Sequence, residues 1–150
     1  MIHNFSRFGK DKTAVIQIFF QKEIFMEQRF FSCEKCGSIL TGRGEHEGKV
    51  ECCSGEMKEI IPGTTEAAQE KHIPVYHVDK NIVTVTVGST EHPMTLEHYI
   101  EWVVLQTKQG DQRKYLKPEN KPEVKFALCD GDEVEAVYAY CNQHSLWKTN

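Results

Sequence analysis

The chain has 150 residues, of which 39% are hydrophobic and 27% are charged, a balance that is typical of folded globular proteins. Its 18 basic and 22 acidic residues give a formal net charge of −4, which does not indicate a nucleic-acid-binding surface. No apolar run reaches the roughly 18 residues of a membrane-spanning helix. We therefore expect a globular protein with neither nucleic acid nor a membrane among its partners.

Residues 1–28 are expected to form an N-terminal extension that is either disordered or lies upstream of a true start at Met26. The stretch has no continuous apolar core and no small-residue cleavage site, so it does not look like a signal peptide. The cysteines of a chain that is not secreted stay reduced and commonly serve metal or redox chemistry. We therefore expect a cytoplasmic protein.

Residues 29–65 are expected to form a small module that a metal ion holds together. Glycines at short intervals leave room only for very short strands. The expected strands are residues 30–32, 38–41 and 49–51. So small a unit cannot bury enough apolar surface to fold unaided, which makes a metal the expected staple. In the linker that follows, residues 65–69 are expected to form one helical turn capped by Thr64 or Thr65.

Residues 66–150 are expected to form an immunoglobulin-like β-sandwich, which makes the fold class all-β. Residues 83–87 alternate between apolar and polar side chains, as a half-buried strand does. A second strand is expected at residues 98–104, with Ile100, Trp102 and Val104 on one face. Short strands separated by turns roughly every 8–12 residues are typical of a sandwich.

The pattern of residues 124–140 predicts a β-hairpin. Residues 124–128 and 134–140 both suit strands, and Asp130-Gly131 between them is a favoured hairpin turn. Alternation along the second strand places four side chains on one face. These are Val134, Ala136, Tyr138 and Tyr140.

The small module contains a ligand set made only of thiolates: Cys33, Cys36, Cys52 and Cys53. A Cys-x-x-Cys pair places two sulfur atoms on one side of a tight turn, and a second pair completes a tetrahedron. Four sulfur ligands indicate zinc or iron, and the spacing alone does not distinguish the two metals. The adjacent Cys52 and Cys53 are expected to distort the tetrahedron. A disulfide between them is disfavoured because their Cα atoms lie only about 3.8 Å apart.

A second set of ligand residues is scattered over the later part of the chain: His72, His92, His98, Cys141 and His144. Each histidine taken alone is more often a surface residue than a metal ligand. Their positions near expected strand ends, with a cysteine close to His144, favour a mixed site of imidazoles and a thiolate. Such a site suits catalysis when it leaves one coordination position open.

The sequence around these ligands resembles the superoxide reductase family. The stretches that carry the resemblance are Glu70-Lys71-His72-Ile73-Pro74, Val87-Gly88-Ser89-Thr90-Glu91-His92-Pro93-Met94, His98-Tyr99-Ile100-Glu101-Trp102 and Cys141-Asn142-Gln143-His144. With the four-cysteine module in front, residues 29–148 are similar to desulfoferrodoxins, the two-iron form of that family. The chain departs from the family pattern in its N-terminal extension and in Cys129, which the ligand pattern does not require.

The resemblance implies two iron ions per chain. The first is bound in a desulforedoxin-like module by Cys33, Cys36, Cys52 and Cys53, where zinc is the expected substitute. The second is a non-haem iron with four equatorial imidazoles and one axial thiolate, supplied by His72, His92, His98, His144 and Cys141. The sixth position is open to solvent. The implied catalytic residues beside it are Lys71 and Glu70, with Glu70 taking the open position once the iron is oxidised.

The implied activity is the one-electron reduction of superoxide to hydrogen peroxide. A ferrous ion with four neutral imidazoles and one thiolate has a net charge of about +1, and Lys71 adds positive charge that favours an incoming anion. The thiolate donates electron density to the iron. The resemblance also implies a rubredoxin-like protein or a reductase as electron donor, the first iron as an electron relay, and a homodimer.

Two other functions fit the same residues. An electron carrier would cycle through the four-cysteine site, with the β-domain as a docking module, and would not consume superoxide. A structural or dimerisation protein would hold zinc and have no colour. Among the remaining residues, His77 lacks the sequence context of His72, Cys129 is expected to be a bystander thiol, and Trp147 is expected to shield the segment 141–144.

Overall fold

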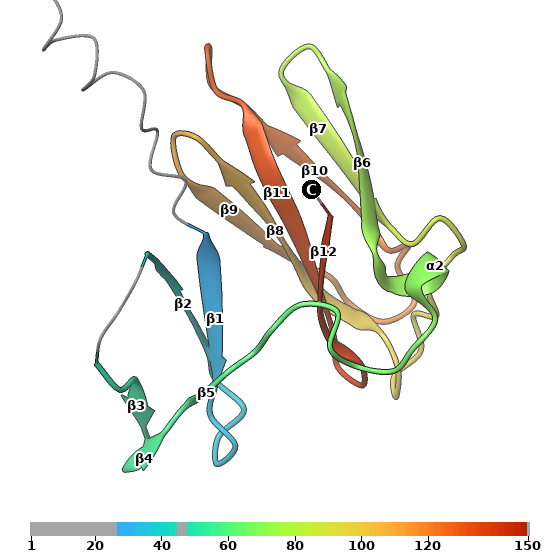
Figure 1. Ribbon diagram of the computed structural model, residues 1–150. Helices are drawn as coiled ribbons and strands as arrows, with labels where there is room; N and C mark the ends of the chain where they lie inside the picture. The colour runs from blue at the N-terminus through green and yellow to red at the C-terminus, as the bar shows by residue number, and fades with distance from the viewer. Residues whose placement is uncertain (1–26, 45–47, 150) are drawn as a thin grey trace, which may run out of the picture.

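The computed structural model describes residues 27–44 and 48–149 (Figure 1). Within these ranges strands predominate and the one helix is α2 (Gln69–His72), so the predicted all-β class is confirmed. No helix in the described part of the chain is long and apolar enough to cross a membrane. Most of the predicted extension lies outside the described residues. The first strand begins at Gln28, and the boundaries 28/29 and 65/66 stay predictions.

The first five strands form a small N-terminal module. Their bounds are β1 (Gln28–Ser32), β2 (Ile39–Arg43), β3 (Glu51–Cys52), β4 (Gly55–Glu56) and β5 (Lys58–Glu59). β1 is the central strand of an antiparallel sheet with the order β2-β1-β5, whereas β3 and β4 pair only with each other. The strands predicted at 30–32 and 38–41 coincide with β1 and β2, and the third prediction overlaps β3 only at Glu51.

The later strands form two antiparallel sheets that face each other (Figure 1). Their bounds are β6 (Pro74–Asp79), β7 (Ile82–Val87), β8 (Ile100–Thr107), β9 (Asp111–Tyr115), β10 (Glu123–Ala127), β11 (Val134–Cys141) and β12 (Ser145–Thr149). One sheet has the order β10-β7-β6 and the other β12-β11-β8-β9. The alternate residues Val83, Val85 and Val87 of β7 are fully buried in the core between the sheets, because every second side chain of a strand points to the same face.

A β-bulge in the pairing of β8 with β11 changes the face that Ile100 occupies. The register shifts by one residue between the pairs Tyr140–Trp102 and Cys141–Ile100. Ile100 therefore joins the core between the sheets, whereas Trp102 and Val104 lie in a separate cluster on the outer face of the four-stranded sheet. The prediction that these three residues share a face was wrong at Ile100, because an inserted residue reverses the alternation.

A second bulge acts in the same way at the other end of β11. The register shifts between Val134 and Ala136. Val134 consequently packs against the core between the sheets, while Ala136, Tyr138 and Tyr140 belong to the outer cluster. The prediction of one shared face for these four side chains was therefore wrong at Val134.

The predicted hairpin of residues 124–140 was also wrong. β10 pairs with β7, and β11 pairs with β8 and β12, so the connection crosses from one sheet to the other. A local turn does exist, since the backbone N–H of Asp132 donates to the carbonyl of Cys129. A favourable turn sequence does not decide which strands pair. Here the two flanking strands belong to different sheets, which bury their side chains from opposite sides of one core.

The single helical turn lies later than predicted. α2 spans Gln69–His72 rather than 65–69, its N-cap is Ala68, and no side chain caps it. The hydroxyl of Thr64 donates instead to the carbonyl of Ile61. Tertiary contacts place this turn, because the backbone N–H of Thr90 donates to the Glu70 carbonyl within it.

The N-terminal module packs on the outer face of the four-stranded sheet. Phe30 of β1 is 1% exposed and lies among buried side chains of β8, β11 and β12, a burial that contributes about 1.5–3 kcal/mol. At the edge of this interface, Arg43 of β2 forms an ion pair with Asp111 and donates to the carbonyls of Thr107 and Gly110. Apolar packing and these hydrogen bonds together fix the module against the sandwich.

Candidate metal centres

The four cysteines of the module converge at the end of β1 and at the β3–β4 turn. One sulfur atom from each of Cys33, Cys36, Cys52 and Cys53 lies within 4.8 Å of the others. The Sγ atoms of Cys36 and Cys52 are 3.6 Å apart, and those of Cys52 and Cys53 are 3.7 Å apart. Metal–sulfur bonds of about 2.3 Å in a tetrahedron place neighbouring sulfur atoms roughly 3.8 Å apart. The set therefore fits a tetrahedral metal ion.

Backbone conformation explains how two adjacent cysteines serve one site. Neighbouring side chains of an extended chain point in opposite directions. Cys53 and Ser54 instead have φ angles of +50° and +55°, a left-handed conformation that is uncommon outside glycine. This turn brings the Cys53 sulfur back toward that of Cys52, so that both sulfur atoms face the same point.

The thiols of this set influence one another strongly. A hydrogen bond with the Ser38 hydroxyl, 3.2 Å away, lowers the pKa of Cys36 to about 6. The hydrogen bond with Cys36 raises the pKa of Cys52 to about 12. Without a metal, negative charge therefore settles on Cys36, and a cation is needed to hold four thiolates together.

The second ligand set is assembled at one end of the sandwich. It comes from α2, from the loop between β7 and β8, and from the end of β11 with the turn that follows. One ligand atom from each of His72, His92, His98 and Cys141 lies within 4.8 Å of the others. His144 completes the set, because its Nδ1 atom lies 3.0 Å from Nε2 of His72 and 3.6 Å from Sγ of Cys141.

The four imidazole rings stand at the corners of a square. Neighbouring ring centroids are 4.6–4.9 Å apart and their planes are close to perpendicular, while His72 and His98 are opposite corners 6.2 Å apart. Half of the distance between the His72 and His98 ring centroids matches the sum of a ring radius of about 1 Å and a metal–nitrogen bond of about 2 Å. The 3.0 Å between the His72 and His144 nitrogens also suits two neighbouring ligands at right angles. Four equatorial nitrogens thus fit one metal ion.

Hydrogen bonds to the outer nitrogens select which nitrogen faces the metal. The Nδ1 atoms of His72 and His92 lie 2.7 Å and 2.5 Å from the carbonyls of Ala68 and Pro93, so each donates its proton there and leaves Nε2 free to bind. The buried Nε2 atoms of His92 and His98 have no hydrogen-bond partner within the described residues. Buried nitrogen atoms without a partner are costly, and a metal ion between them removes that cost.

Burial favours the neutral form of three imidazoles of this site. Desolvation lowers the pKa of His72 and His98, and lowers that of His92 to about 4. Desolvation also raises the pKa of Cys141, although the backbone N–H groups of Gln143 and His144 act in the opposite direction. At neutral pH these three histidines are therefore ready to bind a metal, whereas the thiol needs a cation to release its proton.

Close backbone contacts position the α2 part of the site. A Cβ atom on Gly88 would meet the Thr90 and Lys71 carbonyl oxygens at 2.4 Å and 2.6 Å, and Gly88 has a φ of +84°, so only glycine fits here. The backbone N–H of Gly88 donates to the Ile73 carbonyl. The β7–β8 loop therefore fixes the backbone from which the side chains of Glu70, Lys71 and His72 leave.

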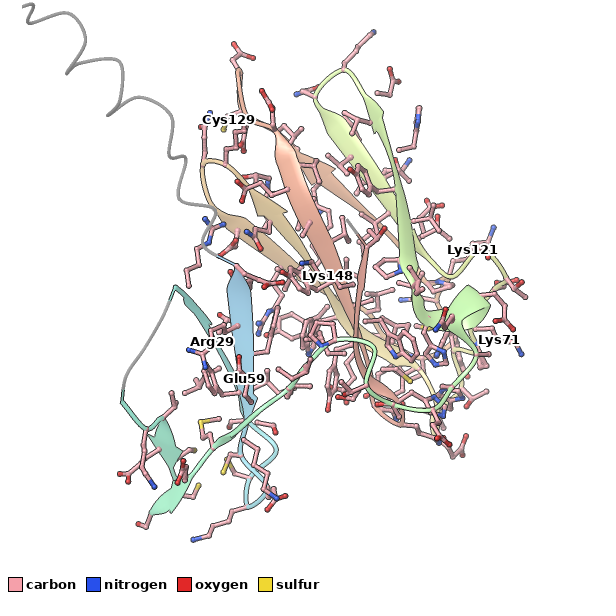
Figure 2. All side chains as sticks on the ribbon, viewed as in Figure 1. Arg29, Glu59, Lys71, Lys121, Cys129 and Lys148 are labelled. Atoms are coloured by element: carbon pink, nitrogen blue, oxygen red, sulfur yellow. The ribbon has the colours of Figure 1, made fainter. Side chains whose placement is uncertain are left out.

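Glu70 and Lys71 directly precede the ligand residue His72 within α2. Lys71 lies in the last turn of α2 (Figure 2). Its charge adds to the effect of burial in lowering the pKa of His72 and His98. His98 and His144 are only half-buried. The charge of Glu70 acts in the opposite direction on the pKa of His72, so charges of both signs act on this ligand.

Other candidate residues lie elsewhere. His77 is exposed on β6, and Cys129 lies at the opposite end of the sandwich from Lys71 (Figure 2). His3 and His46 fall outside the described residues.

Sequence reasoning missed the role of Asn142. Its side chain donates to the Glu97 carbonyl and accepts from the backbone N–H of Tyr99, which joins the His98 loop to the Cys141 turn. Trp147 stacks on His72 at 4.9 Å, in agreement with the predicted shielding. The position of Asn142 between two ligands was the only sequence signal for its role.

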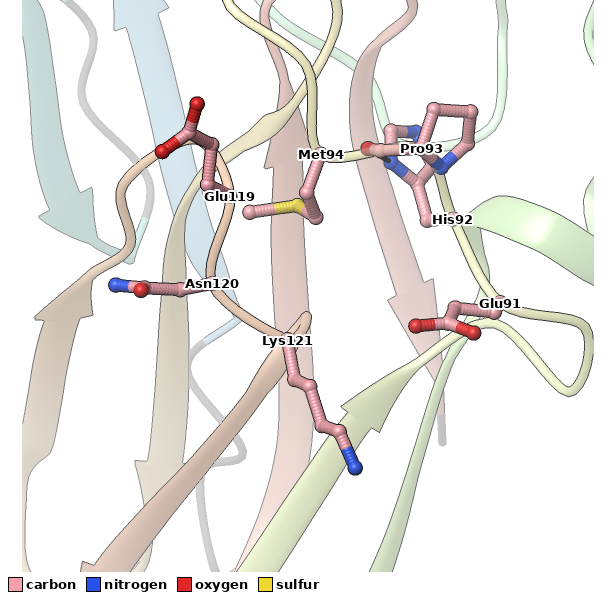
Figure 3. A pocket seen from close by; sticks show the side chains of 7 residues that line it. All are labelled: Glu91, His92, Pro93, Met94, Glu119, Asn120 and Lys121. Carbon is pink, nitrogen blue, oxygen red and sulfur yellow. Dashed lines mark hydrogen bonds between the residues drawn. The ribbon is translucent and has the colours of Figure 1, made fainter.

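A groove of about 400 Å³ lies beside His92, lined by Glu91, His92, Pro93, Met94, Glu119, Asn120 and Lys121 (Figure 3). The Met94 sulfur accepts a hydrogen bond from the backbone N–H of Ile100. The groove thus reaches the ligand residue His92, and its walls carry both signs of charge.

The fold and the two ligand sets define a class of protein, a β-sandwich with a five-ligand histidine and cysteine centre joined to a small four-thiolate module. The sequence model of the family described as Desulfoferrodoxin matches residues 64–150. The chain belongs to the desulfoferrodoxin family.

Relatives and a solved structure agree with this assignment. The chain is 43% identical over 112 residues to a desulfoferrodoxin of Clostridium acetobutylicum, covering 75% of this chain and 85% of that protein. It is 38% identical over 122 residues to one of Nitratidesulfovibrio vulgaris, covering 81% and 95%. The crystal structure of the superoxide reductase from Treponema pallidum superposes with a TM-score of 0.73 at 42% identity, covering 83% of this chain and 99% of that one.

Proposed function

We infer that this protein is a superoxide reductase, which transfers one electron to superoxide and releases hydrogen peroxide. The observation that carries the inference is the square of four imidazoles beside the buried Cys141 sulfur. Five protein ligands leave one position of a six-coordinate metal ion for a small substrate. The family membership and the solved superoxide reductase support the same activity.

The donor sets support iron at both centres. We propose His72, His92, His98, His144 and Cys141 as ligands of the catalytic iron, and Cys33, Cys36, Cys52 and Cys53 as ligands of the other. Imidazole and thiolate both suit iron, and zinc competes at the four-thiolate site. When bound, the catalytic iron supplies the electron that, with two protons, converts superoxide to hydrogen peroxide.

The protein's own residues attract and hold the substrate. Lys71 places a positive charge next to His72 in the chain, which favours an anion over a neutral molecule. The Glu70 carbonyl accepts from the Thr90 N–H and the Ser89 hydroxyl, so the backbone of this pair is fixed. Lys71 is proposed to steer superoxide toward the site, and Glu70 is proposed to occupy the open position after the reaction.

The electron comes from outside the chain. The proposed donor is a rubredoxin-like protein or a reductase, and the exposed Cys36 and Cys53 give it close access to the four-thiolate centre. A homodimer is proposed as the assembly. No disulfide joins any of the six cysteines, and a reducing compartment such as the cytoplasm is proposed as the location.

Metal analysis combined with product analysis tests this function. We expect about two irons per chain and, on addition of superoxide to the reduced protein, one hydrogen peroxide for each superoxide with no dioxygen formed. Dioxygen released together with peroxide would indicate dismutation. A reduced protein that superoxide does not oxidise would support an electron carrier, and a colourless zinc protein would support a structural role.

A further inference from the structure

Three aromatic rings form a continuous stack across the interface between the N-terminal module and the sandwich. Phe30 on β1 lies 5.5 Å from Trp102 on β8, with ring planes 17° apart. Trp102 in turn lies 5.1 Å from Tyr140 on β11, with planes 4° apart. Phe30 and Trp102 are 1% and 3% exposed. The rings therefore form a nearly parallel column in which Phe30 and Trp102 are shielded from water and Tyr140 is half-buried.

Each end of this column is joined to one of the two ligand sets by a short length of chain. Tyr140 is bonded directly to Cys141, the sulfur ligand of the histidine site. Phe30 precedes Cys33 by three residues, which is about 10 Å of extended chain. Phe31, between them, packs against Cys33 in the core of the module. The covalent connection from Cys53 to His72 runs instead through residues 54–71, which is a much longer route.

We propose that Phe30, Trp102 and Tyr140 are the electron-transfer path between the two metal centres, a role that rests on the proposed function. With iron bound at both sites, one electron would pass from the ferrous four-cysteine centre to the histidine centre that superoxide has left ferric, so that one iron would be oxidised as the other is reduced. No bond forms or breaks and no proton moves in this step. An external one-electron donor then reduces the four-cysteine centre again.

The rings act as the medium for the electron and are not oxidised themselves. Electronic coupling decays less steeply through bonded atoms and π-systems in contact than through solvent. The guanidinium of Arg113 lies 4.6 Å from the Trp102 ring centroid, and a cation over the ring disfavours removal of an electron from it. This arrangement suits tunnelling through the column rather than a tryptophan radical.

Tyr138 provides a matched control within the same interface. Its ring lies 4.9 Å from Phe30 but is tilted by 55°, and its hydroxyl donates to Gln106. It is fully buried, as Trp102 nearly is, yet it is not stacked between Phe30 and Tyr140. Removal of the Tyr138 ring therefore disturbs interface packing without breaking the column.

A pulse of superoxide, kept below one equivalent, tests the path in the fully reduced two-iron protein. Superoxide first oxidises the histidine centre, and the later electron transfer is followed as that absorption band fades while the band of the ferric four-cysteine centre grows. We expect Trp102→Leu to slow this second phase several-fold. Trp102→Phe, which keeps a ring, should restore most of the rate of the second phase. Tyr138→Leu should show a second-phase rate close to that of the unmodified protein.

A structural readout accompanies the rates. Near-ultraviolet circular dichroism of the zinc-loaded protein, in which the module stays folded, should show a signal from the Trp102–Tyr140 stack that Trp102→Leu removes and Tyr138→Leu retains. If Trp102→Leu does not fold, Tyr140→Leu interrupts the same column. The proposal is overturned if the second phase is absent from the unmodified protein, if breaking the column leaves it unchanged, or if Tyr138→Leu slows it equally. The first phase, oxidation of the histidine centre by superoxide, reports on the proposed function alone. A failure of the proposed function can therefore be distinguished from a failure of the proposed electron path.

Discussion

The two metal centres are built in opposite ways. The four-cysteine centre uses a single short stretch of sequence, and two of its ligands, Cys36 and Cys53, are exposed. The histidine centre draws ligands from three separate segments, and His72 and His92 are each 2% exposed. Only the second lies at the end of a large apolar core. The local four-cysteine site can depend on its metal for folding. The geometry of the histidine site is instead fixed by the packing of the sandwich.

Removal of the metals should separate the two regions most clearly. Among the described residues, the module's own core cluster has only Phe31, Cys33 and Met57 as buried members, and structural metal sites of this kind contribute about 10–16 kcal/mol to folding. We expect chelation to expose the amides of residues 27–59 to rapid hydrogen exchange while those of β7, β8 and β11 stay protected. Equal protection of both regions would contradict the conclusion that the module, unlike the sandwich, depends on its metal for folding.

Cys141→Ser should affect the histidine centre alone. The Cys141 sulfur is the one thiolate of that set, so its loss should remove the thiolate-to-iron absorption band of the second iron. Cys141 is a fully buried member of the sandwich core, and serine, which is nearly the same size, should keep its packing. Absorption spectra should still show the four-cysteine band, and loss of both bands would instead indicate general unfolding.

Gly88→Ala should weaken the histidine centre through its backbone. The added Cβ would meet the Lys71 carbonyl at 2.6 Å at a residue with φ of +84°, and such strain costs about 1–3 kcal/mol. Urea denaturation should show this loss, together with weaker metal binding at the second centre. Gly110→Ala is the control, because nothing lies within 4 Å of its added atom; equal losses in the two variants would refute the explanation.

Lys71→Ala should slow the capture of superoxide. Removing a charge that steers an anion reduces the association rate, here by about tenfold, and flattens its dependence on ionic strength. Stopped-flow kinetics at several salt concentrations measures both effects. Lys121→Ala removes a charge from the same side of the molecule (Figure 2) and should have a smaller effect; an unchanged rate in Lys71→Ala would exclude Lys71 from the reaction.

The smallest expected effect concerns a surface ion pair of the module. Arg29 donates to both carboxylate oxygens of Glu59 at 2.7 Å and 2.6 Å, and this hydrogen bonding lowers the pKa of Glu59. The pair therefore stabilises the fold above the ordinary pKa of a glutamate, and that contribution disappears as pH falls through the lowered value. Glu59→Gln should cost at most about 1 kcal/mol at neutral pH and nothing in acid, as urea denaturation at the two pH values can check.

Local sequence signals predicted the elements whose geometry is local. The spacing of the cysteines was sufficient to propose the four-cysteine centre, and alternation along residues 83–87 located β7. The faces of Ile100 and Val134 and the partner of β10 could not be predicted, because two bulges and a crossing between sheets depend on the whole core. The histidine centre likewise became recognisable through family resemblance, since only the folded sandwich brings His72 beside His144.

The reaction of the reduced protein with superoxide, followed at the absorption band that Cys141→Ser removes, tests the central claim most directly. We predict that this band appears at a rate proportional to the superoxide concentration, with one hydrogen peroxide formed for each superoxide consumed. Consumption of superoxide without growth of this band, or with a change only at the four-cysteine centre, would contradict the assignment of the histidine centre as the catalytic site.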